Sequence, residues 1–200
     1  VWCGTGTSGK NFCCDWDEIT PDFIFLSKTL AAGYGALSAV VTHSGISDVI
    51  KNKGQGQIQY SNTHQGHSIS VAAALAVQNI INQKTFLRKV ESKGEYLRKY
   101  LHDSLEKNDF YLNVRGRGLR NSLEYKCSNN NLFGTHLKLK LFDQHKIIVD
   151  AKWHRICFPL ALNISKAQLD ENLDKVVKTF NYLKNNWNKY KKRQVRNFIF

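Results

Sequence analysis

The first half of the chain alternates short apolar runs with polar, glycine-containing connections. Residues 23–26 form a four-residue apolar run of the kind that builds a buried parallel strand. After a glycine-containing break, residues 37–42 predict a second strand, and residues 44–51 predict a short helix that is capped by its first residue, Ser44. Residues 55–65 are polar and contain glycine, so an exposed loop is expected there.

A long stretch of helical periodicity occupies the middle of the chain. From Ser68, which is a good N-cap residue, apolar side chains recur at helical spacing as far as Leu105. An interruption is expected near Gln83. A helical stretch of this length is typical of a connection between two domains, so a domain boundary is expected close to this interruption.

The remainder of the chain predicts a small sheet with two helices. The expected strands are residues 111–114, 119–125, 146–149 and 155–158. The expected helices are residues 132–143 and a last helix that starts at Ser165, with apolar positions Leu169, Leu173, Val176, Val177, Phe180 and Leu183 on one face. The alternation of elements indicates an α/β fold with a smaller α+β part.

Composition and charge narrow the possible functions. Of the 200 residues, 42% are hydrophobic, so the chain is expected to fold, and no apolar run approaches the roughly 20 residues of a membrane helix. The net charge is +13, but residues 151–200 contribute +8 of it through eleven Lys and Arg against three acidic residues. Aromatic and basic residues alternate between Trp187 and Arg196, yet a solvated basic tail explains this segment better than nucleic-acid binding.

The cysteines and histidines favour neither a disulfide framework nor a metal site. The five cysteines are odd in number and contain no CxxC pair, which favours a reducing compartment, the cytoplasm. His64 and His67 have the i, i+3 spacing of a ligand pair, but no third ligand is near them in the sequence, so no metal is expected. The chain opens on Val1 and lacks methionine. We therefore expect its N-terminus to have been cut.

Lys28 has the most informative surroundings of any lysine in the chain. A lysine is usually a solvated surface residue, because burying an ammonium group is costly. At the end of an apolar strand and before small residues, however, its amine can condense with an aldehyde cofactor and serve as nucleophile and proton carrier. Gly33 and Gly35 would let the backbone bend around a bulky ring.

The segment Pro21-Asp-Phe-Ile-Phe-Leu-Ser-Lys28, followed by residues 30–41, resembles the lysine segment of class III aminotransferases, the ω-aminotransferase branch of fold type I pyridoxal-phosphate enzymes. Four further segments agree in order: Gly4-Thr-Gly-Thr-Ser-Gly9, Thr63-His-Gln-Gly-His67, Val114-Arg-Gly-Arg-Gly-Leu119 followed by Glu124, and Arg155-Ile-Cys-Phe-Pro-Leu160. The resemblance covers the chain to about residue 181. It implies that residues 1–84 are the end of a large, mostly parallel-sheet, cofactor-binding domain. Residues 85–184 would then form a small α+β domain, and residues 185–200 a basic tail.

The resemblance also implies roles for individual residues. Lys28 would form the internal aldimine with pyridoxal 5'-phosphate and then move a proton between substrate and cofactor. Thr63 would donate a hydrogen bond to the cofactor phosphate of the neighbouring subunit in a homodimer, although a threonine in an ordinary loop is the alternative. Arg155 would hold a substrate carboxylate, a task that suits its planar guanidinium, with a structural ion pair as the alternative. Arg115 and Arg117 are expected to be structural.

The implied reaction is transamination between an amine or amino acid and a 2-oxo acid such as pyruvate or 2-oxoglutarate. Three positions depart from the family pattern: Thr7 replaces Arg, Thr29 replaces Gly and Ala36 replaces Pro. The family's aspartate for the pyridine nitrogen would lie two residues before Val1. We therefore expect the chain to be the carboxyl-terminal part of a longer enzyme or a truncated gene product. An aminomutase of the same fold and a non-catalytic remnant that acts as a dimerising or binding module remain as alternatives.

Overall fold

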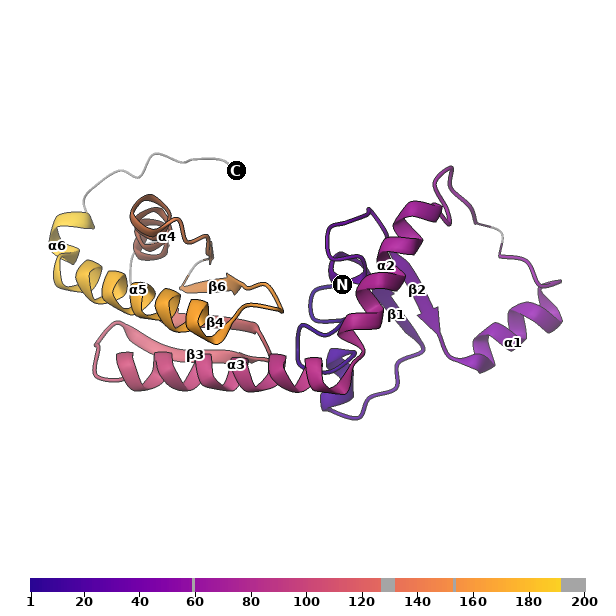
Figure 1. Ribbon diagram of the computed structural model, residues 1–200, viewed down its shortest axis with the longest axis horizontal. Helices are drawn as coiled ribbons and strands as arrows, with labels where there is room; N and C mark the ends of the chain where they lie inside the picture. Colours follow the sequence, from indigo (N-terminus) through magenta and orange to yellow (C-terminus); the bar gives the residue numbers. More distant parts are fainter. Residues whose placement is uncertain (59, 127–131, 153, 192–200) are drawn as a thin grey trace. The chain divides into compact units, whose positions relative to one another are not determined.

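The computed structural model describes residues 1–58, 60–126, 132–152 and 154–191 (Figure 1). The chain forms two compact units, residues 1–89 and residues 90–200. The boundary falls within helix α3 (Lys84–Leu105). No helix in the described ranges has both the length and the apolar character needed to cross a membrane.

The first unit contains a two-stranded antiparallel sheet. Strand β1 (Phe23–Leu26) pairs with β2 (Ala39–Thr42), with Phe23 opposite Thr42 and Leu26 opposite Ala39. The position of the strand is confirmed, but the expectation of a buried parallel strand is wrong. Phe23 and Phe25 are more than half exposed, whereas Leu26 is buried. Successive side chains of a strand point to opposite faces, and the described part of the chain covers mainly one of them.

The helices of the first unit begin where the sequence indicates, but histidines cap them. Helix α1 (Ser44–Lys53) and helix α2 (Ser68–Ile81) follow His43 and His67, whose Nδ1 atoms accept the amides of Gly45 at 3.1 Å and Ser70 at 3.4 Å. The expectation that Ser44 and Ser68 are N-caps is therefore wrong by one position. A neutral imidazole nitrogen accepts a hydrogen bond as a serine oxygen does. Two short 3₁₀ helices, η1 (Cys13–Trp16) and η2 (Lys28–Leu30), complete this unit.

The break between the two long helices is confirmed, because α2 ends at Ile81 and α3 begins at Lys84. Beyond α3 the second unit is built on a four-stranded antiparallel sheet in the order β3-β4-β6-β5. Its strands are β3 (Tyr111–Arg117), β4 (Arg120–Tyr125), β5 (Asp150–Lys152) and β6 (Arg155–Pro159).

The expected strand over residues 146–149 is wrong. The amides of Lys146 and Ile147 donate back to the carbonyls of Phe142 and Leu141, at the end of helix α4 (Leu132–His145). Lys146 also has a positive φ of 58°. These residues therefore terminate a helix, and the chain reaches the sheet only at Asp150.

One hydrophobic core holds the second unit together. Helix α5 (Lys166–Asn185) has Ser165 as its N-cap, with the reciprocal bonds to Gln168 that define a capping box, as the sequence predicts. Its predicted apolar face is largely buried among side chains of α3, α4 and the sheet. The core includes Leu97, Leu101, Leu123, Phe133, Leu137, Ile156, Leu173 and Phe180.

The beginning of the expected basic tail is folded. Helix α6 (Trp187–Tyr190) brings Trp187 to 5.4 Å from Phe133, measured between ring centroids. Both Trp187 and Tyr190 pack partly buried against the core. These rings are therefore used in packing. Residues 192–200 lie outside the described residues.

Gly94, in α3, allows the helix to approach the β3–β4 connection. A Cβ at position 94 would lie 1.7 Å from the carbonyl oxygen of Gly118. Helix propensity alone would favour alanine over glycine by about 1 kcal/mol. We expect Gly94→Ala instead to lower the free energy of unfolding by about 3 kcal/mol or more, because two backbones would have to separate. Urea denaturation measures this change.

The matched control is Glu95→Ala, an exposed position on the same helix, which should change the free energy of unfolding by less than about 0.5 kcal/mol. A Gly94→Ala protein as stable as the control would contradict the packing described for α3.

Candidate functional site

Lys28 lies where β1 gives way to the short helix η2. Its backbone has a φ of 54°, in the left-handed region that a residue with a side chain rarely adopts. Such a conformation costs on the order of 1–3 kcal/mol and persists only where neighbouring groups hold it. The side chain is exposed, and its Nζ lies 4.9 Å from the centroid of the Trp2 ring.

Gln78 holds the turn that begins at Lys28. From helix α2, its Nε2 donates to the carbonyl of Leu30 at 2.9 Å and to that of Thr29 at 3.3 Å. One amide thus satisfies two carbonyls that the short η2 helix leaves outside its own hydrogen bonds. The lysine turn is thereby fixed to the body of the first unit.

The glycine-rich segment of residues 4–9 is linked to the same turn. The Thr29 hydroxyl donates to the carbonyl of Gly4 at 3.2 Å and shares a short hydrogen bond with the Thr5 hydroxyl. Thr29 and the glycine-rich segment lie far apart in sequence, so this link brings two of the predicted motifs together. The link depends on a side chain at position 29, where the resembled family has glycine.

The glycines after Lys28 serve two different needs. A Cβ at Gly35 would lie 2.9 Å from Cα of Ser70, so Gly35 permits close packing on α2. Gly33 has a φ of 85° and open space around it, so it supplies backbone freedom in the turn. Both positions thus support the path of the chain past Lys28.

Thr63 lies in a turn just before helix α2 and is exposed. The turn is closed by Asn62, whose side-chain oxygen accepts the amide of His64 at 3.2 Å. No contact between the described residues joins Thr63 to Lys28. His67 uses its Nδ1 to cap α2, and the described ranges contain no group of three or more metal-ligating side chains.

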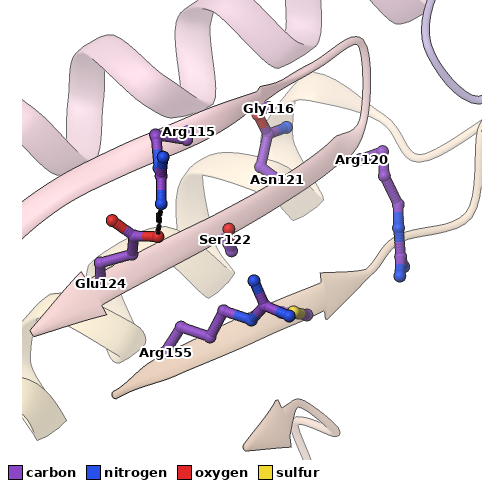
Figure 2. Close-up of a pocket in the computed structure, with 8 residues that line it drawn as sticks. Arg115, Gly116, Arg120, Asn121, Ser122, Glu124 and Arg155 are labelled. Carbon is purple, nitrogen blue, oxygen red and sulfur yellow. Dashed lines mark hydrogen bonds and ion pairs between the residues drawn. The ribbon is translucent and has the colours of Figure 1, made fainter. Parts of the chain in front are cut away.

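Arg155 lies in a pocket of the second unit, on the face of the sheet opposite the core. The pocket has a volume of about 410 Å³ and is lined by Arg115, Gly116, Arg120, Asn121, Ser122, Glu124, Arg155 and Cys157 (Figure 2). The register places Arg155 opposite Glu124 and Cys157 opposite Ser122 on neighbouring strands. Three guanidinium groups and one carboxylate give the pocket a net positive charge.

Arg115 and Arg155, both labelled in Figure 2, differ in what they bind. Arg115 donates from Nε to Glu124 Oε1 at 3.1 Å, with a second, shorter bond from its guanidinium to the same oxygen. The Glu124 side chain is 5% exposed, so this pair is the structural role expected for Arg115. The Nε of Arg155 is buried without a hydrogen-bond partner, and no carboxylate among the described residues pairs with its guanidinium.

Sequence reasoning missed two residues that surround Lys28. Gln78 is a polar residue in the apolar run of α2, and that exception to the pattern was the available signal. Trp2 precedes the glycine-rich motif and had no signal of its own. Lys28 and Thr63 belong to the first unit and Arg155 to the second.

Comparison with known proteins gives a consistent result. The sequence profile of the family described as Aminotransferase class-III matches residues 1–180. An ornithine aminotransferase of Plasmodium yoelii yoelii is 30% identical over 182 residues, which cover 91% of this chain and 42% of that protein. An aminotransferase of Gibberella zeae is 36% identical over 125 residues, which cover 62% of this chain and 24% of that protein.

Solved structures agree with these sequence matches. The ornithine aminotransferase from Plasmodium yoelii superposes with a TM-score of 0.77 at 28% identity, covering 90% of this chain and 46% of that one. A transaminase from the marine bacterium Virgibacillus gives a TM-score of 0.87 over 94% of this chain and 45% of that one. Because the Virgibacillus transaminase is only 22% identical to this chain, this match shows a shared fold alone. The chain spans less than half the length of these relatives.

Replacing Gln78 tests whether it holds the lysine turn. Methionine has a similar length but no donor, so Gln78→Met leaves the carbonyls of Thr29 and Leu30 without this partner. We expect the free energy of unfolding of the first unit to fall by about 1–2 kcal/mol, measured by urea denaturation.

Gln83→Met is the matched control, since Gln83 is exposed and its side-chain Nε2 donates to the carbonyl of Asn79. It should cost less than about 0.5 kcal/mol. Equal losses in the two variants would argue against a special role for Gln78.

Proposed function

The chain belongs to the class-III aminotransferase family, and we propose that it serves pyridoxal-phosphate-dependent transamination between an amine or amino acid and a 2-oxo acid. The observation that carries this proposal is the exposed amine of Lys28, held at the end of β1 by a turn that its neighbours stabilise. The family match includes this residue.

The side chains of the first unit fit pyridoxal 5'-phosphate. In the described part of the chain no carboxylate pairs with the Lys28 ammonium, so this amine is available to an aldehyde, and an aromatic ring lies beside it. Thr63 offers an exposed hydroxyl close to the start of α2, where backbone N–H groups and the helix dipole favour a phosphate. When bound, the cofactor supplies an aldehyde and an electron-accepting pyridine ring.

Lys28 would perform two tasks with the same atom. Its Nζ would hold the cofactor through the aldehyde carbon. The same Nζ would later take a proton from the substrate carbon and deliver it to the cofactor. A turn fixed by Gln78 and Thr29 would keep the amine in place through both tasks.

Arg155 would orient a substrate through its carboxylate. Arg115 already shares its guanidinium with buried Glu124, whereas Arg155 lines the same pocket and its Nε has no hydrogen-bond partner among the described residues. A guanidinium and a carboxylate form two parallel hydrogen bonds, which fix the orientation of the bound acid. A structural role for Arg155 would predict an ion pair instead, and no described carboxylate provides one.

The proposal extends to the oligomeric state of the protein and to its cellular compartment. We propose a homodimer in which Thr63 contacts the cofactor phosphate of the neighbouring subunit, since its exposed turn leaves the hydroxyl accessible. A reducing compartment such as the cytoplasm suits the free thiols of Cys3, Cys14 and Cys157.

Replacing Lys28 tests the proposed chemistry directly. The protein is incubated with pyridoxal 5'-phosphate, reduced with borohydride and digested, and the peptides are analysed by mass spectrometry. We expect the reduced adduct on Lys28, its absence in Lys28→Ala, and a loss of transamination of at least about a thousandfold.

Lys53→Ala, an exposed lysine on α1, is the control and should leave both the adduct and the activity unchanged. An intact protein that gives no adduct at Lys28 would favour the remnant without catalytic function. An adduct together with a rearranged, untransferred amino group would favour an aminomutase.

Replacing Arg155 separates substrate binding from structure. Arg155→Lys keeps the charge but loses the two-pronged geometry, so the KM for the carboxylate substrate should rise about ten- to a hundredfold with little change in kcat. Steady-state kinetics give both constants, and urea denaturation gives the stability of the same variant.

Arg88→Lys, at an exposed position, serves as the control and should change neither constant. If Arg155→Lys lowers the free energy of unfolding while KM stays the same, Arg155 is a structural residue.

A further inference from the structure

Trp2 is held beside Lys28 by contacts on both sides of it in the chain. On one side, the Val1 nitrogen donates to the carbonyl of Phe25 at 3.0 Å, on strand β1. On the other side, the Gly4 carbonyl accepts the Thr29 hydroxyl at 3.2 Å. The residues on either side of Lys28 thus fasten the segment that carries Trp2.

The contact between the two side chains is a cation–π interaction. The Lys28 Nζ lies 4.9 Å from the centroid of the indole, and tryptophan is the best aromatic partner for a cation. The Trp2 residue remains 52% exposed.

We propose that Trp2 is a positioning residue for Lys28. In the free protein the indole holds the ammonium in one orientation. If Nζ holds pyridoxal 5'-phosphate through its aldehyde carbon, with release of one water, the indole beside Nζ would offer an aromatic face to the pyridine ring. This inference rests on the proposed function, because it concerns the same amine.

Replacements at position 2 separate the aromatic ring from the bulk of the side chain. The probe is pyridoxal 5'-phosphate alone, and its Kd is measured from the absorbance of the adduct. Trp2→Leu should raise the Kd about three- to tenfold, whereas Trp2→Phe should retain most of the affinity, because phenylalanine keeps an aromatic face. Tryptophan emission gives a second readout: cofactor binding should quench it, and the part due to Trp2 should be missing in Trp2→Phe.

The free protein provides a readout that needs no cofactor. A ring current from Trp2 should shift the proton resonances of the Lys28 side-chain methylene next to Nζ upfield in NMR spectra. This shift should vanish in Trp2→Leu. If Trp2 does not lie beside the amine, these resonances will have the same positions in Trp2→Leu as in the wild-type protein.

The chain offers a matched control in Trp16, whose ring lies 4.9 Å from the Nζ of Lys10. Trp16→Leu removes a cation–π pair of the same length and should leave the Kd unchanged. Wild-type affinity in Trp2→Leu, together with Lys28 resonances at the same positions as in the wild-type protein, would overturn the inference while the Lys28 adduct, and with it the proposed function, stands. Absence of the adduct in the wild-type protein would overturn both.

Discussion

The candidate site of the first unit depends on a constrained turn that places a lysine in the left-handed backbone region. Lys28 with its φ of 54° would relax to an ordinary conformation if its neighbours allowed it. Gln78 prevents this from one side by binding the carbonyls of Thr29 and Leu30. The glycine-rich segment prevents it from the other side through the Thr29 hydroxyl. The direction in which the amine leaves the backbone is therefore a property of the whole unit.

In the second unit, the register of the sheet decides which side chains share the face with Glu124. Residues 115, 122 and 124 point to the same side of β3 and β4, away from the core. There Glu124 is buried and occupied by Arg115. The neighbouring strand β6 brings Arg155 to the same surface, opposite Glu124. The carboxylate of Glu124 is paired with Arg115 and not with Arg155. A shift of β6 by one residue would turn Arg155 into the core and Ile156 out of it.

Local chemistry was predictable from the sequence, and pairing between distant segments was not. The capping box at Ser165 and the helix break near Gln83 follow from residues close together in the chain. The antiparallel partner of β1 follows from bonds between distant segments, which apolar periodicity does not encode. The helical ending at Lys146 depends on local bonds to the carbonyls of Phe142 and Leu141, which an apolar run does not reveal either. The motif around Lys28 predicts its chemistry, and this stays a prediction, whereas the contacts of Trp2 and Gln78 emerged only from the fold.

The Thr29 side chain joins the local lysine motif to a segment far away in the chain. A glycine at this position, as in the resembled family, would have no hydroxyl for the Gly4 carbonyl and for Thr5. The segment before Gly4 would then lose this attachment and keep the bond from Val1 to Phe25. Trp2 lies between these two attachments, so its place over Lys28 depends on the threonine that follows the lysine. The support of the Lys28 turn in this chain thus relies on a side chain that the resembled family's pattern lacks.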